Sequence, residues 1–133
     1  MKDREKLAVD RIKEIQEKII LLKKDLGAGW VIVLYRTGLP IVSTEAKSIL
    51  EPEPRIIFSI ADRIAKLFSI SISLYNEQIN EMHEGVIIEG KISDIIIGEI
   101  NPDTLLAFNI SKYNIWTKIK IAHTSKEIRK ILE

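Results

Sequence analysis

The fold of this chain is set by residues 54–75, PRIIFSIADRIAKLFSISISLY. Polar side chains recur there every three or four residues, a spacing that places them in one narrow stripe along a helix. Pro54 suits the first helical position, because the backbone N–H at that position has no partner within the helix. The pattern therefore predicts a helix from Pro54 to about Tyr75, and its polar stripe consists of Ser59, Asp62, Lys66, Ser69 and Ser73.

Apolar side chains fill the rest of this segment and would cover roughly two thirds of the helix circumference. A helix that lies on one surface needs an apolar stripe of only about 100°. One sheet face cannot cover the whole apolar arc, so the helix needs a second partner. In a chain of 133 residues, we expect that partner to be another copy of the chain.

The composition is that of a globular protein, and we expect a single domain over residues 1–133. A net charge of +1 gives no overall attraction to nucleic acid. The sequence has no uncharged apolar run of about 18 residues, so membrane insertion is not expected. The absence of cysteine excludes disulfides and zinc–thiolate sites. We expect a cytoplasmic protein, and the abundance of Ile, Lys and Glu fits either a thermophile or an AT-rich genome.

The chain before the central helix predicts a helix and a hairpin. Residues 3–26 carry apolar side chains at alternating spacings of four and three, and the glycines in residues 27–29 end this amphipathic helix. Residues 30–36 form a continuous β-branched and aromatic run, typical of a strand that is covered on both faces. A turn over residues 37–40 connects this strand to a shorter one at residues 41–44.

The chain after the central helix predicts three strands and a final segment that is mostly helical. The strands are residues 84–89, 93–100 and 104–111, and the short separators between them favour an antiparallel meander. Residues 112–133 have helical periodicity, although residues 115–121 also alternate like a strand. The order α-β-β-α-β-β-β-α predicts an α/β (α+β) fold, with a five-stranded antiparallel sheet in a three-layer α/β/α sandwich.

This order resembles the roadblock/dynein light chain family over nearly the whole chain. Asn114 stands where family members often have Asn before the last helix, whereas Ile115-Trp116 replaces the usual following Gly. The motifs that carry the resemblance are GLPIVST at 38–44, which is similar to the family's Gly-x-x-Ile/Val-x-Ser/Thr strand, EGVIIEG at 84–90, DIII at 94–97 and LLAF at 105–108.

The resemblance implies a profilin-like roadblock fold and a protein that is not an enzyme. Family members form homo- or heterodimers through their third strands and central helices, and serve as platforms or activators for small Ras-like GTPases. The expected partners are thus a second copy or a roadblock paralogue, and a small Ras-like GTPase. The residues expected at the dimer interface are Ile57, Ala61, Ile64, Ala65, Phe68, Val86 and Ile88.

No catalytic, cofactor-binding or metal-binding residues are predicted. His83 and His123 lack partners at known ligand spacings, and we interpret both as surface residues. The basic C-terminal segment fits either a solvated helix face or a docking surface for an anionic partner. Trp116 is either a partner anchor or a core side chain, whereas Trp30 is expected in the core. The partner-binding candidates are Trp116, Lys120, Lys126 and Arg129.

Three functions follow from these observations. The first is a dimeric scaffold or regulator of a small GTPase. The second is a small-ligand sensor of the PAS/profilin-like type, in which a sheet and helices enclose a pocket. The third is a nucleic-acid-binding module, which the net charge and the lack of interleaved aromatic and basic residues disfavour.

Overall fold

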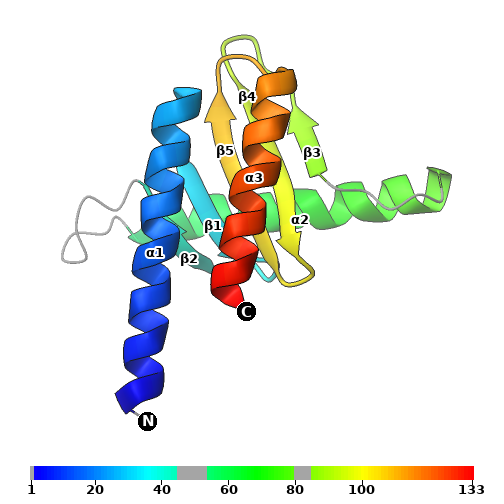
Figure 1. Ribbon diagram of the computed structural model, residues 1–133. Helices are drawn as coiled ribbons and strands as arrows, with labels where there is room; N and C mark the ends of the chain where they lie inside the picture. The colour runs from blue at the N-terminus through cyan, green and yellow to red at the C-terminus, as the bar shows by residue number, and fades with distance from the viewer. Residues whose placement is uncertain (1, 45–53, 80–84) are drawn as a thin grey trace.

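The sheet and its helices follow the predicted order (Figure 1). The computed structural model describes the backbone of residues 2–44, 54–79 and 85–133, and the side chains of residues 8–44, 59–73 and 85–133. The elements are α1 (Lys2–Leu26), β1 (Val31–Tyr35), β2 (Pro40–Ser43), α2 (Pro54–Ile79), β3 (Gly85–Ile88), β4 (Asp94–Asn101), β5 (Thr104–Ile110) and α3 (Ile115–Leu132).

The strands form one antiparallel sheet in the order β2-β1-β5-β4-β3. The β1–β2 hairpin and the β3-β4-β5 meander are both as predicted. β1 and β5, the first and last strands along the chain, pair in the middle of the sheet, where Val31 pairs with Phe108 and Tyr35 with Thr104. This pairing leaves β2 at one edge of the sheet and β3 at the other.

Helices cover both faces of the sheet, so the predicted three layers are present (Figure 1). Strand side chains alternate between the faces: Val31 and Val33 pack under α1 and α3, whereas Ile32 and Leu34 pack against α2. On the first face, Ile15, Ile19, Leu22 and Ile128 close the core, and on the second face Ile64, Ala65 and Phe68 do so.

Helix α1 ends in a Schellman motif, as the glycines predicted. Gly27 adopts a φ of 63°, a conformation that costs glycine little because it has no Cβ. Its N–H donates to Lys24 O at 3.4 Å, and Ala28 N–H donates to Lys23 O at 3.0 Å. Trp30 then enters the sheet with its N–H donating to Asn109 Oδ1 at 2.8 Å. Its side chain is half-buried against the α2-side core.

Residues 115–121 are helical, not a strand, and a capping box explains why. The Asn114 side chain accepts from Thr117 N at 3.1 Å, and Thr117 Oγ1 accepts from Asn114 N at 3.4 Å. These two bonds satisfy backbone donors that the helix itself cannot pair. Every later buried position of α3 follows helical spacing from Thr117, through Thr124 and Ser125 to Ile128.

Candidate partner-binding surfaces

The β3 edge is the most accessible stretch of unpaired strand in the described part of the chain. β3 pairs with β4 from Gly85↔Gly98 to Ile88↔Ile95, and no described strand lies on its other side. Its four residues carry no charge and no proline. Edge strands of this composition present a row of backbone donors and acceptors with which another chain can pair.

The side chains of β3 divide between the two faces of the sheet. Val86 and Ile88 lie on the edge strand, as expected, and are half-buried against the α2-side core. Ile87 faces the opposite side and is 45% exposed. A partner at this edge would therefore meet mainly backbone, with Ile87 as the exposed side chain next to it.

The structure places most of the α2 residues expected at the interface against the chain's own sheet. Ala61, Ile64, Ala65 and Phe68 are between 0% and 6% exposed and pack against the chain's own sheet. They were assigned to a dimer interface because the helix was taken to be apolar on two sides, but one sheet face covers all four. Within one chain they leave little surface for a partner, their place at a dimer interface stays a prediction, and the side chain of Ile57 lies outside the described residues.

Leu67 and Ile70 are the apolar side chains that the described part of α2 exposes. They are 42% and 68% exposed and lie one turn apart. The predicted polar stripe is also exposed, and Lys66 pairs with Asp62 at 2.9 Å. Leu67 directly follows Lys66 of the polar stripe, and Ile70 directly follows Ser69. This position next to the stripe is the sequence signal that could have identified both as exposed. Within residues 59–73, whose side chains the structure describes, α2 therefore offers a partner a smaller apolar surface than the sequence suggested.

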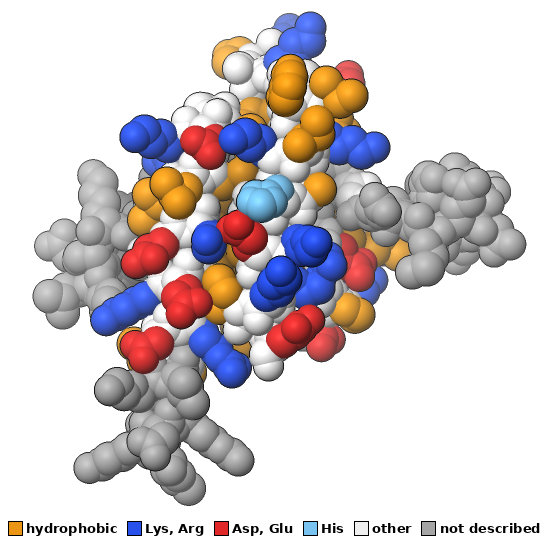
Figure 2. Space-filling view, viewed as in Figure 1, with side chains coloured by type: hydrophobic (Ala, Val, Ile, Leu, Met, Phe, Trp, Pro, Cys, Tyr) orange, Lys and Arg blue, Asp and Glu red, His pale blue; other side chains and the backbone are white. Residues whose placement is uncertain are grey.

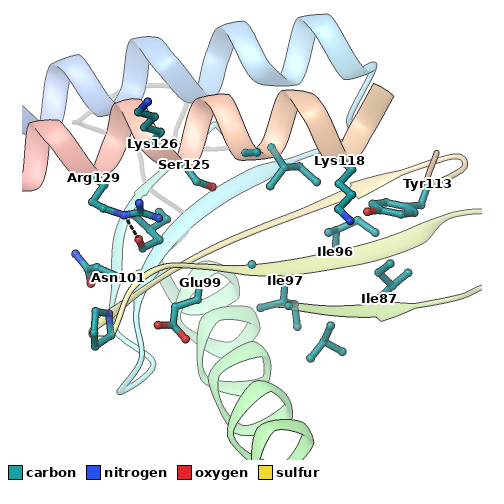
Figure 3. Close-up of a pocket in the computed structure, with 17 residues that line it drawn as sticks. Ile87, Ile96, Ile97, Glu99, Asn101, Tyr113, Lys118, Ser125, Lys126 and Arg129 are labelled. Carbon is teal, nitrogen blue, oxygen red and sulfur yellow. Dashed lines mark hydrogen bonds between the residues drawn. The ribbon is translucent and has the colours of Figure 1, made fainter. Parts of the chain in front are cut away.

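A groove of about 870 Å³ runs between α3 and the β3–β4 strands (Figure 3). Ile87 and Ile96 lie on the strand side of the groove, and Lys118, Lys126 and Arg129 line its α3 side. Arg129 Nε donates to Ile100 O at 2.6 Å, so this guanidinium is already held by the sheet. The result is an open, mainly apolar groove with a basic side, continuous with the β3 edge.

The four partner-binding candidates on α3 do not form one surface. Lys126 and Arg129 line the groove, whereas Lys120 turns toward α1 and lies 3.5 Å from Asp25. Trp116 is 71% exposed at the start of the helix, which excludes the core position considered for it. Spacings of four, six and three residues place these side chains at different angles around a helix.

Helices α1 and α3 are joined by a charged cluster around Glu127. Its carboxylate lies 3.0 Å from Lys18 Nζ and 2.9 Å from His123 Nε2. The hydrogen bond from Lys18, opposed by some desolvation, lowers the pKa of Glu127 from its ordinary value of 4.5. His123 is thus a surface residue, as interpreted, but with a definite partner, while His83 lies outside the described residues.

The described residues contain no group of three or more His, Asp or Glu side chains placed to hold a metal ion. In the same residues, none of the helices has the length and hydropathy needed to cross a membrane.

Comparison with known proteins places the fold. No protein-family model and no curated protein sequence matches the chain. Among solved structures, it is similar to Myxococcus xanthus MglB, with a TM-score of 0.76 and 20% identity over 90% of this chain and 94% of that one. It is also similar to an MglB with a tetrameric arrangement, with a TM-score of 0.76 and 14% identity over 91% and 89% of the two chains.

A roadblock/LC7 domain from Streptomyces avermitilis gives a TM-score of 0.68, with 16% identity over 79% of this chain and 85% of that one. These similarities agree with the observed sheet order and with the helices on each face of the sheet. The chain has the roadblock/LC7 fold, as its sequence motifs implied.

Proposed function

We propose that the chain is a non-enzymatic scaffold or regulator that assembles with a second copy, or with a roadblock paralogue, and engages a small Ras-like GTPase. The β3 edge carries this proposal, because it is uncharged and open to a second strand. The fold supports it, because the sequence resembles a family whose members pair through this strand and bind such GTPases. The MglB with a tetrameric arrangement is a self-associated neighbour of the same fold.

Antiparallel pairing of two β3 strands would join two sheets into one and bring the two copies of α2 onto the same face. Helix α2 already contacts β3 within one chain, so the two helices would approach each other beside the joined edge. Leu67 and Ile70 are then the exposed apolar side chains that a neighbouring helix or a GTPase could cover.

Any effect on GTP hydrolysis would come from ordering the catalytic groups of the GTPase. Two arginines with described side chains lie near the α2 face, Arg36 and Arg63. The Cζ atom of Arg36 lies 5.6 Å from the centroid of the Phe68 ring, and Arg36 Nη1 donates to Pro102 O at 3.4 Å. Arg63 is exposed on α2. An activator acting by position alone is consistent with this arrangement.

Light scattering during size exclusion tests the assembly. We expect a dimer or a larger even-numbered assembly at micromolar concentration, and a monomer would contradict the proposal. A pull-down and a single-turnover GTPase assay with Ras-like proteins of the same genome test the second half. A folded variant that no longer dimerises should lose GTPase binding, whereas the exposed-surface variant Lys126→Glu, away from the β3 edge, should assemble and fold normally.

The groove favours a second candidate function, that of a small-ligand sensor. Its volume of about 870 Å³ lies within the usual range for ligand sites. Arg129, one of its polar lining groups, is already committed to Ile100 O, and the β3 edge supports the scaffold, which is our conclusion. A thermal-shift screen of metabolites, repeated on Lys118→Glu, separates the two functions, because a scaffold shows no ligand-dependent shift.

A further inference from the structure

Four strongly exposed isoleucine and tryptophan side chains gather at one end of the molecule. Ile92 is 90% exposed in the turn between β3 and β4, and Ile115, Trp116 and Ile119 are 70%, 71% and 53% exposed in the first turns of α3. We call these four residues the apical patch. Side chains with such exposed fractions project from the surface, and they do not line a hollow.

The two parts of the apical patch lie close together because one carboxylate joins them. Asp94 Oδ1 accepts from Gly90 N at 3.3 Å in the β3–β4 turn, and Asp94 Oδ2 accepts from Tyr113 N at 3.2 Å just before α3. The turn and the start of α3 also lie at the same end of the sheet in Figure 1. Asp94 thus holds the β3–β4 turn to the start of α3 through two backbone donors.

Lysines surround the apical patch. Lys91, Lys112 and Lys118 are exposed and form no ion pair with any residue whose side chain is described. Figure 2 shows hydrophobic side chains gathered at the upper end of the molecule with Lys and Arg side chains around them. In the two segments that carry the patch, residues 89–94 and 112–120, Lys91, Lys112, Lys118 and Lys120 stand against Glu89 and Asp94.

We propose that the apical patch docks the protein onto an anionic membrane surface. Indole rings favour the headgroup region of a bilayer, where their apolar body and N–H are both accommodated. Lysine stems cover apolar surface while their ammonium groups reach lipid phosphates and carboxylates. A projecting apolar tip within a basic ring fits a flat anionic surface, whereas protein hot spots are centred in packed pockets. Such docking is peripheral and involves no inserted segment.

The two tryptophans allow a direct test with the full chain. Trp30→Phe leaves Trp116 as the sole tryptophan, and Trp30 is half-buried against the α2-side core. The fluorescence emission of Trp116 is followed as vesicles of phosphatidylcholine with about 30% phosphatidylserine are added. The titration is repeated with vesicles of phosphatidylcholine alone. We expect a blue shift and protection from acrylamide with the anionic vesicles, and about tenfold weaker partitioning onto the neutral ones.

Co-sedimentation of variants with the same vesicles identifies the residues involved. Trp116→Ala, and separately Lys112→Glu combined with Lys118→Glu, should each lower the bound fraction, the latter by about tenfold or more at low salt. Lys130→Glu is the matched control, since it removes an exposed lysine at the far end of the same helix and should bind like the wild type. All of these positions are exposed, so circular dichroism should show unchanged folding.

Two results would overturn the proposal. The first is binding that is absent, or equal on neutral and anionic vesicles and insensitive to Lys112 and Lys118. The second is protection of Trp116 from acrylamide in the absence of lipid, which would mean that a second copy of the chain already covers the patch. Neither result bears on pairing at β3, because that pairing is read from oligomeric state in solution.

Discussion

The two edge strands of the sheet, β2 and β3, differ in how far their unpaired backbone groups are protected from pairing with another chain. β2 begins at Pro40, which has no N–H to offer a neighbour, and the β1–β2 register shifts between Val33 and Leu34. Ile41 and Val42 pack against the α1-side core. β3 has no proline and no register shift in its pairing with β4. Its Gly85–Ile88 backbone is regular, uncharged and beside an open groove.

The difference indicates that β2 is protected from pairing and β3 is left available for it. A long-lived protein with one unprotected apolar edge is expected to use that edge, because an idle one invites aggregation. Each of the following experiments either removes the difference between the edges or measures it more finely.

The largest expected effect is loss of the fold that presents both edges. Phe68 is fully buried and packs with Ile32 and Leu34 of β1 and Ile97 of β4. Phe68→Asp buries an unpaired carboxylate at a cost above about 4 kcal/mol, comparable with the whole stability of a small domain. We expect unfolded or aggregated protein by circular dichroism, while Ser69→Asp at the exposed neighbouring position should fold normally.

The next effect removes the difference between the edges without unfolding the chain. Ile87→Lys adds a like charge to each strand of a symmetric β3 pair of four-residue strands, which should weaken dimerisation roughly a hundredfold. Leu39→Lys is the matched control, because Leu39 is an apolar side chain, 56% exposed, beside the other edge. Sedimentation equilibrium measures both variants. A dimer of unchanged strength in Ile87→Lys would show that assembly does not use β3.

A smaller effect measures how β2 is anchored. Thr44 Oγ1 accepts from Val31 N at 2.9 Å and donates to Val31 O at 3.3 Å, just beyond the end of β2. Thr44→Val removes both bonds and leaves the Val31 N–H unpaired, which should lower the free energy of unfolding by about 1 kcal/mol. Denaturant titration checks this value. Thr37→Val, in the exposed β1–β2 turn, should change it little, and an equal loss in both variants would contradict the role given to Thr44.

The smallest effect concerns the contact between α1, which lies beside β2, and α3, which lies beside β3. The hydrogen bond from Lys18 lowers the pKa of Glu127 in the folded state, so this contribution to stability is present above the ordinary pKa of 4.5. It is lost as the pH falls through the lowered folded value. Glu127→Gln should slightly flatten the acid limb of stability against pH at low salt. Because the pair is solvent-exposed, high salt should abolish the difference between variant and wild type.

Most of the architecture could be predicted from local patterns. The β1–β2 hairpin, the three-strand meander and both outer helices follow from periodicity and from Gly, Pro and Asn at the breaks. Residues 115–121 looked ambiguous because isoleucines at alternate positions also satisfy a strand. The Asn114–Thr117 capping box decided for the helix, and its Asn-x-x-Thr spacing was already present in the sequence.

The surfaces were less predictable, because they depend on how elements meet. The sequence showed the apolar side chains of α2, but it could not show that one sheet face covers Ala61, Ile64, Ala65 and Phe68 together. The basic residues of α3 were also visible, yet their division between α1 and the groove follows from the angle at which the helix crosses the sheet. The apical patch needed the turn at Ile92 to be placed beside the start of α3.

The hydrogen bonds of Asp94 have a consequence for the speed and strength of any encounter at that end of the molecule. Because the carboxylate fixes the β3–β4 turn to the residue before α3, the projecting side chains on both segments hold their spacing before contact is made. A surface that arrives already ordered loses little conformational entropy on binding. Loss of these two hydrogen bonds alone would weaken binding, because it gives that entropy back to the unbound protein.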